Sequence, residues 1–138
     1  MAYWLFKTEP SAWSWEQQKK KGTKGEAWSG VRNYQAANNM KAMQKGDLGF
    51  FYHSVEEKRI VGIVEVSGLY RLDPTDEKGK FGLVEVKAVC DLPSPVTLAA
   101  IKAEARLAEM VLVKNSRLSV QPVTPAEWQI ISTMGGLT

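Results

Sequence analysis

The sequence contains few residues that support metal or covalent chemistry. Among its 138 residues there is one cysteine, Cys90, and one histidine, His53. A single cysteine excludes an internal disulfide, and no Cys/His cluster has the spacing of metal ligands. The glycine-rich signatures that cradle phosphate groups are also absent. We therefore expect no metal and no cofactor, and we expect Cys90, which lies on an alternating segment, to be a small core residue.

Long hydrophobic runs are absent as well. The first residues, MAYWLFKTEP, have no basic stretch and an apolar run of only about four residues, unlike a signal peptide. No segment approaches the roughly 18 consecutive apolar residues of a membrane span. We expect a soluble, cytoplasmic protein that has no membrane partner.

A strong excess of one charge is also lacking. The chain has 18 Lys and Arg against 15 Asp and Glu, a net charge of +3. This balance permits an anionic partner without requiring one. The one basic cluster comprises Lys19, Lys20, Lys21 and Lys24. It is either a solvated helix end, which the helix dipole favours, or a patch that contacts phosphates.

Tryptophan, in contrast, is abundant. Four of the five tryptophans lie in the first 28 residues, and the full set is Trp4, Trp13, Trp15, Trp28 and Trp128. Each indole buries a large area and carries one donor that needs a partner. The cluster is therefore either an N-terminal core or the wall of a site for a flat ligand.

Capping and periodicity signals predict the helices. Ser14 begins a helix, with Gln17 completing a capping box and Gly22 ending it. A second helix begins at Arg32 or Asn33 and ends at Gly46. Later in the chain, residues 97–110 are expected to form one or two short helices. Thr124 is expected to cap a last helix that has Pro125 at its first position.

Aromatic and β-branched runs predict the strands, at residues 3–7, 47–54, 59–72, 83–92 and 116–123. The second and third of these are expected to form a hairpin, and Pro93 and Pro95 to break the fourth. Mostly antiparallel strands with helices around them predict an α+β fold. We expect a single domain over residues 1–138, built on a small curved sheet or barrel.

Candidate catalytic groups are poorly matched. His53 is next to Ser54, but neighbours on a strand point to opposite faces, so they do not form a triad. Glu9 is a lone carboxylate beside a proline and is more typical of a structural acceptor. The alternation also places Phe51 with His53 on one face, and Phe50, Tyr52 and Ser54 on the other. We expect a protein that is not an enzyme.

Candidate binding groups gather in the stretch WSGVRNY, residues 28–34. An indole or phenol supplies a stacking face, an asparagine amide matches a base edge, and an arginine binds phosphate bidentately. In the alternative interpretation, Trp28 and Tyr34 are core residues, while Arg32 and Asn33 cap the helix. The pattern alone leaves both interpretations open.

Seven motifs in order resemble the EVE domain family over about residues 3–134: YWLFKTEP, WSGVRNYQAANNM, GDLGFFYHS, IVGIVEV, DPT, PVTLAAIK and SRLSVQPVTPAEW. The family includes bacterial one-domain proteins. The resemblance implies a PUA-like fold, a small mixed open β-barrel flanked by helices, related to the YTH domains that read N6-methyladenosine. It also implies binding of modified bases, such as 5-methylcytosine, in DNA or RNA.

The resemblance further implies a base pocket made from four motifs. Its residues in this chain are Lys7, Thr8, Glu9 and Pro10; Trp28, Val31, Arg32, Asn33 and Tyr34; Tyr52, His53 and Ser54; and Arg117, Leu118 and Ser119. The lysines at 19, 20, 21 and 24, with Lys7, Arg32 and Arg117, are expected to contact phosphates. One departure is Ser29, where many relatives carry an acidic residue, and it bears on which polar edge is read.

The expected function is therefore a monomeric nucleic-acid-binding module that takes a flipped, modified base into an aromatic and polar pocket. Two alternatives stay open. One is a module that binds a small molecule or a protein. The other is an enzyme acting on a nucleotide or base, with His53 and Glu9 as its acid and base.

Overall fold

A mixed six-stranded sheet organises the chain. The computed structural model describes residues 1–137. The strands are β1 (Tyr3–Thr8), β2 (Glu26–Ala27), β3 (Leu48–His53), β4 (Arg59–Leu72), β5 (Gly82–Thr97) and β6 (Val120–Val123). Their order is β2-β5-β4-β3-β1-β6, in which β1 and β3 are parallel and the other neighbours antiparallel. The sheet is not closed, since β2 and β6 are its two edges, so the predicted α+β open barrel is confirmed.

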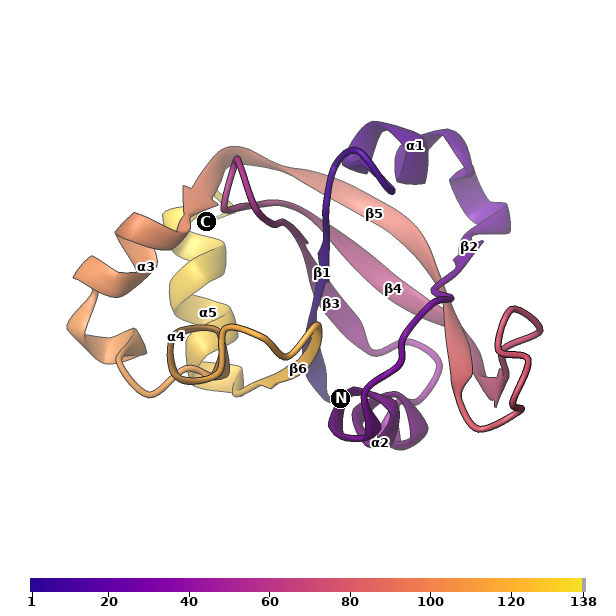
Figure 1. Ribbon diagram of the computed structural model, residues 1–138. Coiled ribbons are helices and arrows are strands. Elements are labelled where there is room, and N and C mark those ends of the chain that lie inside the picture. The colour runs from indigo at the N-terminus through magenta and orange to yellow at the C-terminus, as the bar shows by residue number, and fades with distance from the viewer. Residues whose placement is uncertain (138) are drawn as a thin grey trace.

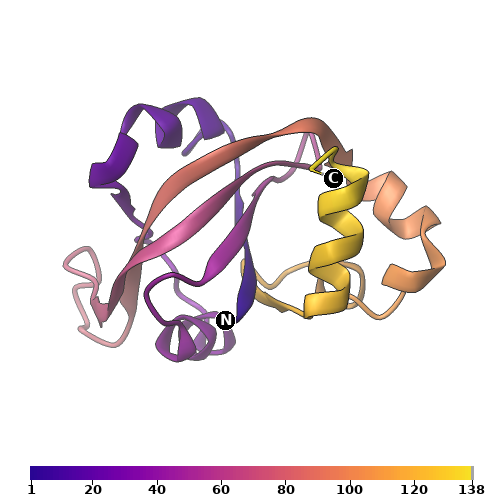
Figure 2. The same ribbon diagram turned by 180° about the vertical axis from the view of Figure 1, so that it is seen from behind.

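Helices cover both faces of this sheet (Figure 1). They are α1 (Trp15–Lys20), α2 (Tyr34–Ala42), α3 (Leu98–Ala103), α4 (Val111–Lys114) and α5 (Pro125–Met134), with short 3-10 turns η1 (Gly22–Lys24) and η2 (Ala105–Leu107). Figure 2 shows α5 running alongside the sheet, near α3, while α1 and α2 lie toward the opposite end. Within residues 1–137, no helix has the length and apolar character to cross a membrane.

The predicted caps fix where the helices begin. Ser14 accepts from the backbone N–H of Gln17 at 3.1 Å, and the Gln17 side chain accepts in return from the Ser14 backbone at 2.8 Å. Thr124 and Glu127 form the same reciprocal box at the start of α5, where Pro125 is the first residue. Both boxes satisfy backbone donors that a helix start leaves unpaired.

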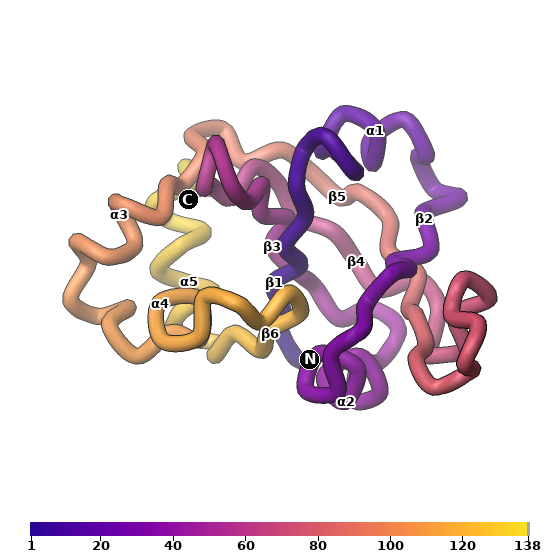
Figure 3. Tube along the Cα trace, viewed as in Figure 1, coloured from indigo at the N-terminus to yellow at the C-terminus, as the bar shows by residue number. Residues whose placement is uncertain are grey.

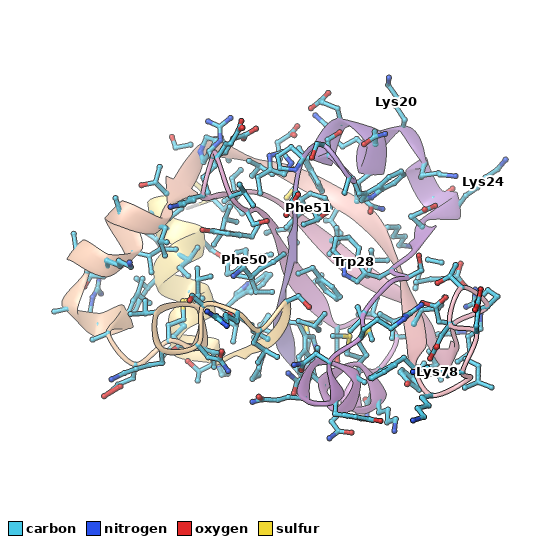
Figure 4. All side chains as sticks on the ribbon, viewed as in Figure 1. Lys20, Lys24, Trp28, Phe50, Phe51 and Lys78 are labelled. Carbon is cyan, nitrogen blue, oxygen red and sulfur yellow. The ribbon has the colours of Figure 1, made fainter. Side chains whose placement is uncertain are left out.

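Strand alternation separates two apolar cores. Trp4 and Phe6 of β1 lie in one core with α1 and α2, whereas Leu5 lies in the other with α3, α4 and α5. In β3, Phe51 joins the first core and Phe50 the second, and Figure 4 shows these two rings on different sides of the strand. We call these the α1–α2 core and the α5 core.

Two strand predictions were wrong in β5. The strand continues through Pro93 and Pro95, pairing with β4 again at Val96. Both prolines are exposed, and β2, the other neighbour of β5, pairs only near Val86, so the missing N–H groups break no ladder there. Cys90 is exposed rather than in the core, because the pairing shifts register beside it.

The end of α2 also differs from the prediction. The helix ends at Ala42, four residues before Gly46, and Met43 turns into extended backbone with ψ of 148°. Gly46 instead forms the turn into β3, with a φ of 93° that favours glycine.

Candidate nucleic-acid interface

A cavity of about 390 Å³ opens beside the end of β1. The end of β1 and the β1–α1 loop form one side, and the segment from β2 to α2 forms another; Figure 3 traces both segments. The lining residues are Lys7, Thr8, Ala12, Trp13, Glu26, Ala27, Trp28, Ser29, Gly30, Val31, Arg32 and Ser119. Six of these residues were predicted for the base pocket, and they come from three of its four motifs.

Trp28 is anchored in the α1–α2 core and forms part of the cavity wall. Its exposed fraction is 7%, and its ring meets Phe6 and Phe51 edge-on at centroid distances of 5.2 and 5.7 Å. Its backbone N–H donates to the Val84 carbonyl at 2.8 Å. Trp28 is therefore a core residue that also borders the cavity, and its role in binding a base stays a prediction.

The indole N–H of Trp28 has no hydrogen-bond partner within residues 1–137. The indoles of Trp4, Trp13 and Trp15 donate to other side chains, whereas that of Trp128 likewise has no partner among the described residues. The fully buried side-chain atoms without a partner in residues 1–137 are Gln121 Oε1 and Ser132 Oγ, so the Trp28 nitrogen is not one of them. An indole donor without a protein partner, on a residue that lines a cavity, is suited to an acceptor on a flat ligand.

Trp13 supplies a second aromatic wall that was not assigned to the pocket from the sequence. Its indole N–H donates to the Gln18 side chain at 2.9 Å. Gln18 is fully buried in α1 and donates in turn to the Val86 carbonyl at 3.1 Å. This chain of bonds fixes the half-buried ring of Trp13 relative to the sheet. The tryptophan cluster pointed to such a wall from the sequence, but the choice of Trp13 depends on its bond to a buried glutamine, which the sequence did not reveal.

The carboxylate of Asp73, which we call the loop clamp, holds the β2–α2 segment in place. It accepts from the Gly30 backbone N–H at 2.8 Å and from the Arg32 guanidinium at 3.1 Å. Thr75 donates to its other oxygen from both its backbone, at 2.8 Å, and its hydroxyl, at 2.6 Å. Gly30 has a φ of 82°, which suits glycine, and this backbone turn aims its N–H at the clamp.

The loop clamp is charged despite its burial. Burial by itself raises the pKa of Asp73, but the hydrogen bonds from Thr75, Gly30 and Arg32 lower the pKa to about 2. The side chain has no exposed surface, whereas that of Arg32 is 37% exposed. Arg32 therefore neutralises a buried carboxylate while its side chain stays partly exposed, and the residue lines the cavity.

Lys7 contributes to the lining, but its ammonium points elsewhere. The ammonium donates to the Ser116 carbonyl and lies 5.7 Å from the centre of the Tyr52 ring. Burial lowers the pKa of Lys7. The backbone N–H of Lys7 donates to the Ser119 carbonyl at 2.9 Å, which brings the β6 end of the site to β1. Thr8, the next residue, is on the opposite face of β1 and points to the cavity side.

Four predicted pocket residues lie outside this cavity for clear physical reasons. Asn33 caps α2 by accepting from the Ala36 backbone N–H at 2.9 Å. Tyr34 is 64% exposed and packs on Phe81. Leu118 is 2% exposed and lies in the α1–α2 core, while Tyr52 lies in the α5 core on the far face of the sheet.

The remaining predicted residues border other hollows or solvent. Glu9, Pro10 and Ser54 line a separate cavity of about 210 Å³ beside the β3–β4 turn. His53, again with Pro10, lines a third of about 520 Å³ near α1. Arg117 is exposed on the loop before β6. The sequence motifs therefore fold near one another but divide among several surfaces.

Both ring nitrogens of His53 have hydrogen-bond partners, so neither is available for catalysis. Its Nε2 accepts from the Trp15 backbone N–H at 3.0 Å, and its Nδ1 lies 2.9 Å from the Glu57 carboxylate. An acceptor at Nε2 requires the proton at Nδ1, so the imidazole is a neutral structural link. This hydrogen bond is also the main cause that lowers the pKa of Glu57. The geometry does not favour the acid–base role considered for His53.

The four lysines of the basic cluster divide into two pairs. Lys19 bonds to Asp91 and Glu16, both at 2.9 Å, and Lys21 lies 3.4 Å from Glu26. Lys20 and Lys24 are exposed, and Figure 4 shows both side chains extending away from the body of the molecule. Those two are the members of the cluster that are available to phosphates.

No group of His, Cys, Asp and Glu within residues 1–137 has the arrangement of a metal site. The chemistry that the cavity offers is therefore stacking, hydrogen bonding and charge. Its aromatic walls come from Trp28 and Trp13, its hydroxyls from Thr8 and Ser119, and a cation from Arg32.

Known proteins resemble this chain over nearly its whole length. The family model of the EVE domain matches residues 2–134. Human thymocyte nuclear protein 1 is 30% identical over 165 residues, covering 96% of this chain and 73% of the human protein. A crystal structure from Agrobacterium tumefaciens has a TM-score of 0.96 at 55% identity, covering 99% of this chain and 94% of that one.

A further solved structure is the human THYN1 protein in complex with DNA that contains 5-methylcytosine. It has a TM-score of 0.92 at 29% identity and covers 99% of this chain and 98% of that one. The predicted PUA-like fold is confirmed by these matches. The chain belongs to the EVE domain family.

Proposed function

We propose that the protein binds nucleic acid and takes one modified base, such as 5-methylcytosine, out of its stack into the cavity beside Trp28. The observation that supports the proposal is that Trp28, whose indole N–H has no hydrogen-bond partner within residues 1–137, lines a cavity of about 390 Å³. Sites for small ligands commonly span roughly 300–1,000 Å³, so the volume suits a single base with part of its sugar. The 5-methylcytosine DNA in the human THYN1 complex supports the same class of ligand.

The energetic terms are compatible with this role. Removing a base from a stack costs a few kcal/mol, and the cost is least in single strands or at mismatched or damaged bases. Stacking on an aromatic side chain returns about 1–3 kcal/mol per base. Hydrogen bonds from Trp28, Thr8 and Ser119 add to this. A base-sized cavity with rigid walls discriminates a methyl group by about 1–3 kcal/mol.

Long-range attraction would come from cations around the cavity. Lys20, Lys24 and Arg117 are exposed, and Arg32 keeps part of its guanidinium accessible. Each phosphate contact releases counterions and makes the affinity depend on salt. This sequence-independent binding would precede capture of the base.

The test compares two buried tryptophans. Trp28→Phe removes the indole N–H at the cavity, and Trp128→Phe removes one in the α5 core, on the other face of the sheet. Binding is measured by fluorescence anisotropy on duplexes that differ only in one 5-methylcytosine, at two salt concentrations. We expect the native protein to prefer the methylated duplex by on the order of tenfold, Trp28→Phe to lose most of this preference, and Trp128→Phe to keep it.

Two outcomes would count against the proposal. In the first, the native protein binds both duplexes equally, which excludes a preference for the modified base, or binds neither at physiological salt, which favours the small-molecule or protein-binding alternative. In the second, Trp28→Phe keeps the full preference, which moves the base site away from the cavity. Thermal melting of each variant checks that it remains folded.

A further inference from the structure

An aromatic pair lies outside the cavity, at the start of α2. Tyr34 is 64% exposed, which is unusual for a large aromatic side chain in a folded protein. Its ring packs against Phe81 with a centroid distance of 4.9 Å and an interplanar angle of 40°. We call Tyr34 and Phe81 the aromatic pair. Phe81 packs against one side of the Tyr34 ring, and most of the Tyr34 surface is open to solvent.

This aromatic pair is tied to the wall of the cavity. Tyr34 follows Arg32 by two residues, and Arg32 lines the cavity. Arg32 also bonds to Asp73 at 3.1 Å and to the Thr75 hydroxyl at 3.0 Å, both in the β4–β5 loop. Phe81 belongs to the same loop, which closes through an Asp73 N–H to Phe81 carbonyl bond of 3.0 Å. The cavity wall and the aromatic pair therefore form one connected surface.

The loop that carries Phe81 is ordered by its own aspartate. The Asp76 carboxylate accepts from the backbone N–H groups of Lys78, Lys80 and Phe81 at 3.1, 2.9 and 2.7 Å. Lys78 and Lys80 are exposed and have no ion pair within residues 1–137, and Figure 4 shows Lys78 at the outer side of the loop. Glu77, immediately before Lys78, is also exposed and partly offsets their charge.

We infer that the aromatic pair is a stacking platform for the nucleotide next to the one whose base enters the cavity, with Lys78 and Lys80 at its phosphates. This inference rests on the proposed function. When a base leaves the stack, its neighbour loses a stacking partner, and an exposed tyrosine backed by a second ring replaces that partner. The adjacent lysines favour an anionic strand as the occupant over an apolar protein segment.

The platform makes a prediction that differs from that of the cavity. Since Tyr34 contacts a neighbouring nucleotide rather than the modified base, Tyr34→Ala lowers affinity for methylated and unmethylated duplexes by the same factor. Stacking of about 1–3 kcal/mol per base corresponds to a loss of about fivefold to 150-fold. The preference for 5-methylcytosine stays at the native ratio. Tyr34→Phe keeps the ring and binds within about twofold of the native protein.

The experiment measures binding of the same duplex pair by anisotropy for the native protein, Tyr34→Ala, Tyr34→Phe and Gln35→Ala. Gln35 is the exposed, non-aromatic neighbour on α2 and is the matched control, expected to bind as the native protein does. A double change, Lys78→Gln with Lys80→Gln, is expected to flatten the salt dependence by about 0.9 units for each lost contact with a duplex phosphate.

The two proposals fail in different ways. Tyr34→Ala with native affinity overturns the platform, and so does a Tyr34→Ala variant that loses the methyl preference, since that places Tyr34 at the base itself. A native protein that shows no methyl preference overturns the proposed function instead. Thermal melting distinguishes lost stacking from unfolding, and the exposure of Tyr34 predicts an almost unchanged melting temperature.

Discussion

The guanidinium of Arg32 donates a 3.1 Å hydrogen bond to the carboxylate of Asp73, 41 residues further along the chain. The same carboxylate accepts from the Gly30 backbone, so it holds the β2–α2 segment at two points. This segment forms one wall of the cavity and leads directly to Tyr34. The positions of the cavity wall and of the aromatic pair therefore both depend on Asp73.

The lowered pKa of Asp73, the loop clamp, predicts that the stability of the fold depends on pH. The pKa of Asp73 falls from 3.8 to about 2 on folding. A depressed carboxyl pKa stabilises the fold above about pH 4, and this stabilisation is lost as the pH falls toward 2. The shift corresponds to about 2 kcal/mol in the free energy of unfolding.

Asp73→Asn keeps the size of the side chain and removes its charge. We expect the variant to lose at least about 2 kcal/mol at neutral pH. The difference from the native protein should narrow between about pH 4 and pH 2, measured by urea denaturation. Glu77→Gln, at an exposed position in the same loop, is the matched control and should show no such trend. A difference that is constant over this range would show that the charge of Asp73 is not what stabilises the loop.

The two pairs of lysines in the basic cluster should behave differently. Lys20 and Lys24 have no ion pair within residues 1–137, so replacing both with glutamine is expected to reduce the slope of log affinity against log salt by about 0.9 per duplex phosphate contact. Lys102, which is exposed on α3 at the other end of the molecule, is the matched control (Figure 1). An equal reduction from Lys102→Gln would show that the protein attracts nucleic acid through its net charge and not through this cluster.

His53 should be a neutral imidazole protonated at Nδ1. The Trp15 backbone N–H donates to Nε2, which requires a lone pair on that nitrogen. Because the chain contains one histidine, a nitrogen-15 NMR spectrum of the ring reports on this residue alone. Finding the proton on Nε2 would contradict the assignment and would return His53 to the list of possible catalytic groups.

Gly62 is expected to tolerate no side chain. A Cβ at this position would lie 2.1 Å from the Trp15 ring, which packs over the bare backbone of β4. Overpacking of this kind costs about 1–3 kcal/mol, and we expect Gly62→Ala to lower the free energy of unfolding by at least that amount. In a Trp15→Phe background the smaller ring leaves room, so the cost should fall. Equal costs in both backgrounds, measured by thermal or urea unfolding, would mean that Trp15 is not the obstacle.

Local chemistry made much of the fold predictable. The boxes at Ser14 and Thr124 depend on residues three positions apart, so their helix starts could be identified from the sequence. Alternation in β3 also assigned Phe51 to one face and Phe50 with Tyr52 to the other. The same alternation placed Tyr52 and His53 on opposite faces, although the family resemblance grouped them in one pocket.

Contacts between distant residues were not predictable. The hydrogen bond between Asp73 and Gly30 joins loops 43 residues apart, and no spacing in the sequence predicts it. The parallel pairing of β1 with β3 is likewise non-local. Asn33 was ambiguous for a different reason, because its side chain could either cap a helix or contact a base. Only the position of the Ala36 N–H decided between them.

The central claim is that a base occupies the cavity beside Trp28, and the five indole N–H signals of the protein test it directly. In a proton–nitrogen NMR titration with a duplex containing one 5-methylcytosine, we expect the Trp28 signal to move most, because its N–H, which has no partner within residues 1–137, gains an acceptor. The Trp128 signal, from the α5 core, should stay in place. Movement of Trp128 with an unchanged Trp28 would contradict the account.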